Sequence, residues 1–217
     1  KETRKKLNKN KSLIGFCGGP WTVACYMING KGDGKFKLAL NEIKKNKSLL
    51  TKLLDNIGKH SVNHLYQQYV NGCDTLMIFE SWAGLVDDLD HKDILIDPIE
   101  KIIKNLKSMG VLAPIIVLPR GIKKNVVNYV DNVNMDILSV DYSIDIKWLL
   151  KNLKKDIVLQ GNIAPEKIKI GGEQLDDEVN NLLNFTKGRK HIFCSGHGLL
   201  PQTPVKNIER VIEIIRS

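Results

Sequence analysis

The chain has 217 residues, of which 42% are hydrophobic, and a formal net charge of +9. This length is enough to bury a substantial core, and the sequence contains no run of about 18 apolar residues that would predict a transmembrane helix. Lysines supply most of the positive charge and are spread along the chain, without the aromatic-interleaved basic patch typical of nucleic-acid binding. We therefore expect a globular protein with neither a membrane nor a nucleic acid as partner. Its charge is either a solvated surface or an attraction for an anionic metabolite.

The N-terminal residues and the cysteines bear on cellular location. The opening stretch KETRKKLNKNKS lacks the apolar segment of a signal peptide, and the chain does not begin with Met, so we expect either processing or a missing upstream part. None of the four cysteines belongs to a C-x-x-C pair: Cys17, Cys25, Cys73 and Cys194. Free, buried thiols in a reducing compartment are the simplest interpretation. We expect a cytoplasmic protein, with an organelle matrix as the alternative.

Six short apolar runs, each ending in small or polar residues, recur along the chain. In chain order they are SLIGFCGG from Ser12, TLMIFES from Thr75, APIIVLPR from Ala113, DILSVDY from Asp136, DIVLQGN from Asp156 and HIFCSGHG from His191. They are rich in Ile, Val, Leu and Phe and do not alternate cleanly with polar residues. This pattern predicts parallel strands that are buried on both faces.

Longer segments with helical periodicity lie between these runs. DPIEKIIKNLKSMG places Ile99, Ile102, Ile103 and Leu106 on one face, with Gly110 as its expected end. PVKNIERVIEIIRS does the same with Val205, Ile208, Val211, Ile212 and Ile215. Alternation of buried strands and helices predicts βαβ units and a parallel sheet, in a single domain that spans residues 1–217.

The positions of the polar residues decide between two α/β architectures. A doubly wound sheet places its ligand at one switch point and often carries G-x-G-x-x-G, which GFCGGPW does not match. Here polar residues follow nearly every predicted strand: Ser81, Arg120, Asp141, Asn162 and His197. A (β/α)₈ barrel builds its active site from the C-terminal ends of many strands. We therefore predict an α/β fold of the (β/α)₈ TIM-barrel type with six of its eight βα units present.

Three candidate site residues come from the first two predicted strands and the segment between them. Pro20 is suited to the first position of a helix, which would carry Tyr26; a half-buried tyrosine bonded to a backbone carbonyl is the structural alternative. Glu80 and Ser81 must face opposite ways along a strand. Ser81 can donate to a carboxylate but lacks a G-x-S-x-G elbow, so it is not expected to be a nucleophile. Glu80 is either a general base or a carboxylate that caps neighbouring backbone amides.

Two histidine features lead to opposite expectations. His197 lies between two glycines after the last predicted strand, where the backbone can approach a ligand closely and the imidazole can bind an anion. A core histidine is the alternative. His60 and His64 have zinc-like spacing on a helix, but no Glu follows His60 and no third ligand is near in the sequence. We expect a solvated helix face there and no metal.

Four of these segments closely resemble the uroporphyrinogen decarboxylase family of haem biosynthesis. They are GFCGGPWTVACYM, FESWAG, LQGN and GHGLLPQTP, in the order and spacing of the family from about Ser12 to the C-terminus. The first and last are specific to the family, and the other two are weaker alone. The resemblance implies a homodimeric (β/α)₈ barrel without cofactor or metal, in which Tyr26, Ser81 and His197 contact the substrate.

The resemblance also implies what this sequence does not contain. The first two strands of the family carry an Arg-Gln-Ala-Gly-Arg motif and the catalytic Asp, and neither occurs here. The six predicted strands would then be the third to eighth of the barrel, the C-terminal two-thirds. No residue of the chain inherits the role of that Asp, so the catalytic residue is unknown and the chain alone is expected to be inactive.

The implied reaction is removal of the carboxyl groups of the four acetate side chains of uroporphyrinogen, a cyclic tetrapyrrole, to give coproporphyrinogen. The enzyme would be a carboxy-lyase. Two rivals belong to other classes. Zinc and corrinoid methyltransferases share the barrel but need Cys ligands, and the corresponding stretches read LPRG and SGHG. A non-catalytic tetrapyrrole-binding remnant is the third hypothesis, and the true length of the gene product distinguishes it.

Overall fold

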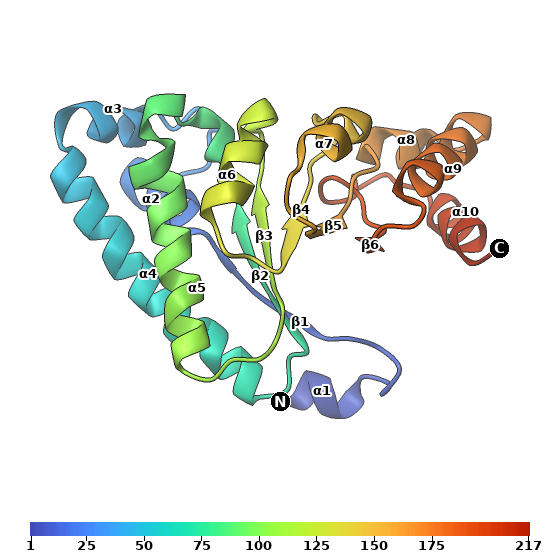
Figure 1. The fold of residues 1–217 in the computed structure, drawn as a ribbon, viewed down its shortest axis with the longest axis horizontal. Coiled ribbons are helices and arrows are strands. Elements are labelled where there is room, and N and C mark those ends of the chain that lie inside the picture. The colour runs from blue at the N-terminus through green and yellow to red at the C-terminus, as the bar shows by residue number, and fades with distance from the viewer. The chain divides into compact units, whose positions relative to one another are not determined.

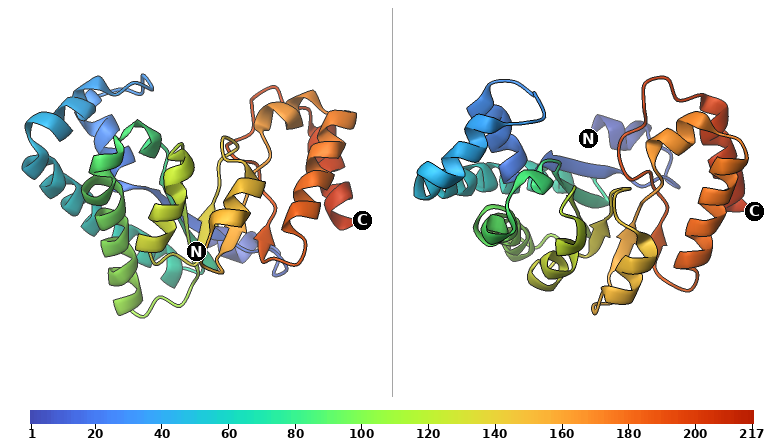
Figure 2. Two further views of the ribbon diagram at one scale, coloured as in Figure 1. Left: turned by 45° about the horizontal axis from the view of Figure 1, so that its top comes forward. Right: turned by 90° about the horizontal axis from the view of Figure 1, so that it is seen from above.

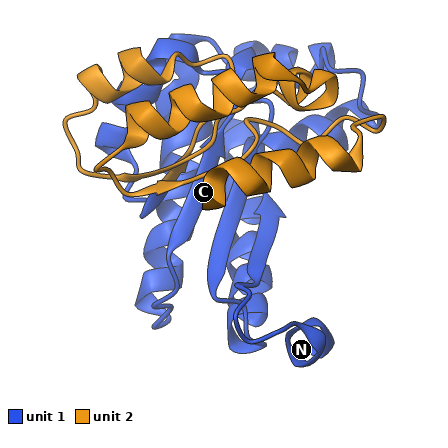
Figure 3. Ribbon diagram, turned by 90° about the vertical axis from the view of Figure 1, so that its right-hand side faces the viewer, with its two compact units in different colours: residues 1–137 blue, residues 138–217 orange.

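A computed structural model describes all residues, 1–217. The chain divides into two compact units, residues 1–137 and residues 138–217, coloured separately in Figure 3. Neighbouring strands of the sheet follow each other in chain order. The expectation of a single domain over residues 1–217 stays a prediction.

Unit 1 alternates strands with helices, as the apolar runs predicted (Figure 1). Its strands are β1 (Ile14–Gly18), β2 (Thr75–Glu80) and β3 (Ile115–Pro119). Its α-helices are α1 (Glu2–Lys6), α2 (Pro20–Asn29), α3 (Lys37–Lys45), α4 (Lys47–Val70), α5 (Asp97–Ser108) and α6 (Val126–Asn132). Short 3-10 turns η1 (Ala83–Leu85), η2 (Asp88–Asp90) and η4 (Lys123–Asn125) and a π-turn η3 (Lys92–Ile96) complete it.

The three strands of unit 1 are parallel, and their register decides which residues share a face. Gly18 lies beside Phe79, and Phe79 lies beside Leu118. Because side chains alternate along a strand, Glu80 faces the side opposite to Phe79. Helices α4 and α5 contact each other along their lengths (Figures 1 and 2).

Helix α5 confirms its predicted face and its predicted end. Ile99, Ile102, Ile103 and Leu106 are all buried. Asp97 and Pro98 begin the helix, as acidic residues and prolines favour. Gly110 has φ +83°, a conformation that glycine adopts without the penalty of a Cβ.

Burial on both faces was predicted for every strand, and this was wrong for the last strand (His191–Ile192), where neither residue is buried, and for β1. The side chains of Ile14 and Phe16 are 42% and 60% exposed, whereas all of β3 is buried. On one side β1 is bonded to β2; on its other edge the Gln68 amide accepts from Phe16 N (2.6 Å) and donates to Phe16 O (2.9 Å). A side chain of α4 thus satisfies this backbone position, and the apolar face of β1 is left uncovered.

Unit 2 repeats the alternation with shorter strands. They are β4 (Ile137–Ser139), β5 (Val158–Gln160) and β6 (His191–Ile192), and β5 pairs with β6 in parallel. The helices are α7 (Ile146–Asn152), α8 (Pro165–Ile170), α9 (Glu173–Thr186) and α10 (Val205–Arg216). All six predicted strands are therefore present across the two units.

The buried side of α10 differs from the prediction. Its buried residues are Asn207 and Val211, whereas Val205 is 68% exposed and Ile212 and Ile215 are also exposed. The Asn207 amide donates to the carbonyls of Ile168 (2.8 Å) and Lys169 (3.1 Å) at the end of α8. These bonds join the buried side of α10 to the end of α8.

The cysteines and the helices agree with two further expectations. All four cysteines are free thiols, although Cys25 alone is fully buried. Burial raises the pKa of the Cys17 thiol to about 12. None of the helices is both long and apolar enough to cross a membrane.

Candidate active site

Glu80, at the end of β2, holds the start of helix α2. Its carboxylate is fully buried; Oε1 accepts from Trp21 N (2.9 Å), and Oε2 accepts from Thr22 N (2.9 Å) and Thr22 Oγ1 (2.8 Å). A helix N-terminus has unsatisfied N–H groups that a carboxylate stabilises. Any side chain at Gly19 would overlap this carboxylate. The sequence left two roles open for Glu80, a general base and a cap of backbone amides, and the structure shows the cap. The Glu80 side chain points away from the face at the ends of the strands.

Tyr26 lies one and a half turns into the same helix, which begins at Pro20 as predicted. Its side chain is 45% exposed, and its ring meets Phe36 edge-on with centroids 5.2 Å apart. The Trp82 ring lies 4.9 Å from the ring of Phe36 and 6.4 Å from that of Tyr26. Tyr26 is thus backed by two aromatic rings on one side and open to solvent on the other.

Ser81 directly precedes Trp82 and is half-buried. Two glycines bring the chain after β2 against the chain after β3: Gly84 N donates to Arg120 O (2.9 Å), and a Cβ on Gly84 would lie 2.6 Å from Gly121 O. The Trp21 indole N–H donates to Trp82 O (3.0 Å), which ties the same loop to α2. In unit 1, Tyr26 thus lies near the Trp82 ring and Ser81 precedes Trp82 in the chain, whereas a ligand shared by Tyr26 and Ser81 stays a prediction.

Phe36 is a member of this cluster that sequence analysis missed. It is fully buried and has φ +45°, which is unusual for a bulky residue. Asp33 supports the turn, since its Oδ1 accepts from Lys35 N (2.9 Å) and Phe36 N (2.8 Å). The Gly- and Asp-rich stretch GKGDGKF was the available signal for a specific turn at this point.

The LQGN motif joins two loops of unit 2. Asn162 Nδ2 donates to Ile144 O (2.8 Å) and to Asp141 O (3.2 Å), and so ties the end of β5 to the loop after β4. Gly161 has φ +133°, and a Cβ there would crowd Val140 O. Backbone geometry therefore accounts for Gly161 and Asn162 of the motif, whereas the buried Gln160 Oε1 has no hydrogen-bond partner.

His197 lies in the loop that follows β6. Gly196 N donates to Ile163 O (2.8 Å), and Ser195 forms a parallel bridge with Ile163. Gly196 is buried because it packs on the backbone of Tyr142, whereas His197 itself is exposed. The core-histidine alternative is thus wrong for His197, and its imidazole is open to solvent. Tyr26 and Ser81 belong to unit 1 and His197 to unit 2, so a ligand shared by all three stays a prediction.

His191, at the start of β6, is a more buried histidine than His197. Its Nε2 lies 2.7 Å from Gly161 O, and burial lowers its pKa. A neutral imidazole whose nitrogen already meets a backbone carbonyl has a structural role. We therefore do not assign His191 to the site.

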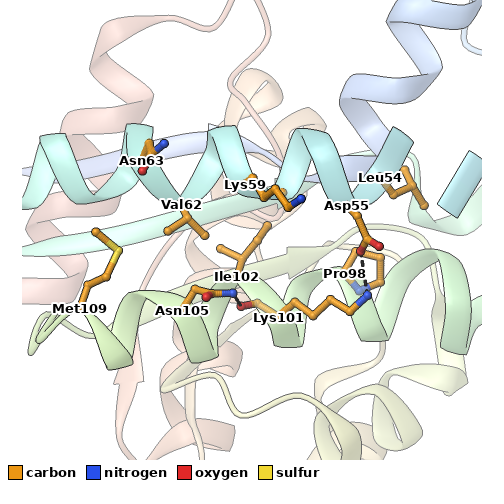
Figure 4. Close-up of a pocket in the computed structure, with 11 residues that line it drawn as sticks. Leu54, Asp55, Lys59, Val62, Asn63, Pro98, Lys101, Ile102, Asn105 and Met109 are labelled. Carbon is orange, nitrogen blue, oxygen red and sulfur yellow. Dashed lines mark hydrogen bonds and ion pairs between the residues drawn. The ribbon is translucent and has the colours of Figure 1, made fainter. Parts of the chain in front are cut away.

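Two other features lie on the outer helices of unit 1. A groove of about 530 Å³ runs between α4 and α5 (Figure 4), crossed by an ion pair between Lys101 Nζ and Asp55 Oδ1 (2.7 Å). Its lining comes from the two helices and includes no strand-end residue. His60 and His64 are both exposed on α4, which confirms the solvated helix face. That no metal binds this pair stays a prediction.

The alternation of strand and helix, with polar residues following the strands, defines an α/β protein of the barrel type. Two solved structures support this class at the level of the fold. A methyltransferase from Methanosarcina mazei superposes with a TM-score of 0.79 at 18% identity, covering 97% of this chain and 60% of that one. A B12-independent methionine synthase from Shewanella sp. W3-18-1 gives a TM-score of 0.66 at 17% identity, covering 98% and 64%.

The chain belongs to the uroporphyrinogen decarboxylase family, whose model matches residues 1–217. The uroporphyrinogen decarboxylase of Orientia tsutsugamushi (strain Boryong) is 37% identical over 219 residues, covering 99% of this chain. That of Rickettsia bellii (strain RML369-C) is 35% identical over 217 residues, covering 100%. The chain spans 63% and 64% of the lengths of these two relatives. The resemblance seen in the sequence motifs is thereby confirmed.

Proposed function

We propose that the protein containing this chain is a carboxy-lyase that converts uroporphyrinogen to coproporphyrinogen. The observation that carries the proposal is the family match over all 217 residues, with relatives that bear this enzyme's name. The proposal includes Tyr26, Ser81 and His197 as substrate contacts. It also includes a cytoplasmic homodimer that uses no cofactor or metal.

The reaction needs an electron sink beside each acetate group. An acetate on a neutral pyrrole cannot lose carbon dioxide, because the resulting carbanion is not stabilised. Protonation of the adjacent ring carbon makes the pyrrole cationic. The bond between the methylene and the carboxyl carbon then breaks, and its electron pair enters the ring. Carbon dioxide leaves, a proton adds to the methylene carbon to give a methyl group, and the ring carbon releases the proton it had gained, which restores the neutral pyrrole.

The residues of this chain are suited to hold the substrate during that sequence. The hydroxyls of Tyr26 and Ser81 and the imidazole of His197 can each donate a hydrogen bond to a carboxylate. Donors that are fixed before the reaction stabilise a charged transition state better than mobile water does. The bond from the Trp21 indole to Trp82 O ties the backbone that follows Ser81 to α2. The acid that protonates the ring is not assigned to any residue of the chain.

Substitution of the three contacts tests the proposal in the gene product that contains this chain. Tyr26→Phe, Ser81→Ala and His197→Ala should each lower kcat/KM for uroporphyrinogen by about 10- to 100-fold, because each removes one charge-assisted hydrogen bond. Unfolding free energies should change little, since Tyr26 and His197 are exposed and Ser81 is half-buried. The measurement is chromatography of the oxidised porphyrins after timed reactions.

His60→Ala is the matched control, because His60 is equally exposed but lies on α4. It should leave kcat/KM unchanged. Equal activity of the wild type and all three site variants would contradict the site assignment. Binding of porphyrins without turnover would favour the tetrapyrrole-binding remnant, and transfer of a methyl group would favour the methyltransferase alternative.

A further inference from the structure

Arg120 is a cation at the strand ends of unit 1 whose charge has no acidic partner. It directly follows β3, where Pro119 lies beside Glu80 in the register, and Arg120 N donates to Glu80 O (3.1 Å). The parallel pairing of β2 and β3 therefore continues one residue past β3, and Arg120 lies next to Ser81. Because Glu80 faces the helices, its neighbours Ser81 and Arg120 continue the opposite face.

The guanidinium is held against the aromatic cluster that also supports Tyr26. Arg120 Cζ lies 6.0 Å from the centroid of the Trp82 ring, a distance at which a cation is attracted to the ring face. Trp82 in turn contacts Phe36, and Phe36 contacts Tyr26. This contact restricts the position of the guanidinium. It does not occupy the hydrogen-bond donors of the guanidinium.

Neighbouring charges do not neutralise Arg120. None of the ion pairs within residues 1–217 includes it, whereas Arg4 pairs with Asp74 and Arg210 pairs with Asp176. The nearest carboxylate on the neighbouring strand β2 is that of Glu80, which accepts hydrogen bonds from backbone N–H groups at the N-terminus of α2. A guanidinium carries five N–H donors and no acceptor, so it binds acceptors and anions only. Within residues 1–217 the guanidinium therefore keeps its hydrogen-bond donors available for an anionic group.

We infer that Arg120 binds a carboxylate of the substrate beside Ser81, with its guanidinium oriented by Trp82. The inference rests on the proposed function for the identity of the ligand. A planar guanidinium matches a carboxylate with two parallel hydrogen bonds. Uroporphyrinogen carries eight carboxylates, so a site for it needs fixed cationic donors as well as neutral ones.

Binding of stable porphyrins tests this inference separately from catalysis. The probes are uroporphyrin I, with eight carboxylates, and coproporphyrin I, with four, titrated by fluorescence into the gene product that contains this chain. Arg120→Met keeps the apolar stem and should weaken uroporphyrin binding by about 10- to 100-fold. Arg120→Lys keeps the charge without the planar fork and should give an intermediate loss. Lys44→Met, on the exposed side of α3, removes the same charge elsewhere and should have no effect.

Salt dependence separates a contact with the ligand from a structural role. Added salt should weaken uroporphyrin binding by the wild type more than by Arg120→Met. Equal affinity of wild type and Arg120→Met, or equal losses in Arg120→Met and Lys44→Met, would overturn the inference, as would a wild type that binds neither porphyrin. A wild type that binds uroporphyrin through Arg120 but releases no carbon dioxide would support the inference and refute the proposed function.

Discussion

Glu80→Ala is expected to destabilise the protein by about 3 kcal/mol at about pH 4. The substitution leaves Trp21 N, Thr22 N and Thr22 Oγ1 without their acceptor in a buried place, and each lost partner costs on the order of 1 kcal/mol or more. Urea unfolding followed by circular dichroism measures the change. Because α2 carries Tyr26, substrate affinity should fall together with stability.

Glu80→Gln separates the hydrogen bonds from the charge. It keeps the volume and an amide oxygen as acceptor, so it should cost less than Glu80→Ala. Burial raises the pKa of the Glu80 carboxyl from its ordinary 4.5 to about 7, although the three donated hydrogen bonds oppose the rise. In the folded state the proton is therefore held to a higher pH than in the unfolded chain.

The sign of the pH dependence follows from that raised pKa. The contribution of Glu80 to the free energy of unfolding is fully present below about pH 4, where Glu80 is protonated in both the folded and the unfolded state. It is lost as the pH rises through about 7. Wild type should therefore lose on the order of 3 kcal/mol relative to Glu80→Gln over this range. A difference between the two unfolding free energies that stays constant from about pH 4 to about pH 8 would contradict a buried Glu80 carboxyl with a raised pKa.

Gly196→Ala is expected to destabilise unit 2 by about 2 kcal/mol and to weaken substrate binding. A Cβ at Gly196 would overlap Tyr142 N and would lie 2.9 Å from Tyr142 Cβ. Overlap with backbone atoms cannot be relieved by a rotamer change, so the loop itself must move. His197 is the next residue and would move with it.

Gly198→Ala is the matched control on the other side of His197. A Cβ at Gly198 meets nothing within 4 Å, and its φ is outside the left-handed region. Stability and kcat/KM should therefore stay near those of the wild type. The measurements are urea unfolding and steady-state kinetics on both variants. Equal effects of the two substitutions would show that the close approach at Gly196 does not position His197.

The strands and helix α5 could be predicted from the sequence because their signals are local. Apolar runs such as TLMIFES and APIIVLPR are long enough to indicate buried strands without knowledge of their neighbours. The four-residue spacing from Ile99 to Ile103 likewise indicates one helix face. The family motifs identified the positions of Tyr26, Ser81 and His197, although the shared ligand of the three remains a prediction.

Other features depend on contacts between segments that are distant in the sequence. Asn207 lies on the buried side of α10 and donates to two carbonyls of α8, a contact that the apolar stripe of the helix did not predict. The role of Glu80 could not be decided between base and cap until α2 was placed at its carboxylate. The exposure of Phe16 could not be predicted either, because an apolar run does not show whether anything covers a given face.

The unit 1 cluster shows how these contacts combine into a site. Glu80 fixes α2 and hence Tyr26, while Ser81 and Trp82 follow it on the same chain. Gly84 brings the Arg120 backbone to this loop. Residues with structural roles therefore alternate with residues proposed to bind the substrate along a single strand end, and a change in one group is expected to affect the other.

The number of carbon dioxide molecules released per uroporphyrinogen consumed tests the central claim most directly. It is measured on the gene product that contains this chain, with the porphyrin products identified by mass spectrometry. The proposed function predicts four carbon dioxide molecules per tetrapyrrole, with coproporphyrinogen as the final product. Uroporphyrinogen that is bound or consumed without loss of any carboxyl group would contradict it.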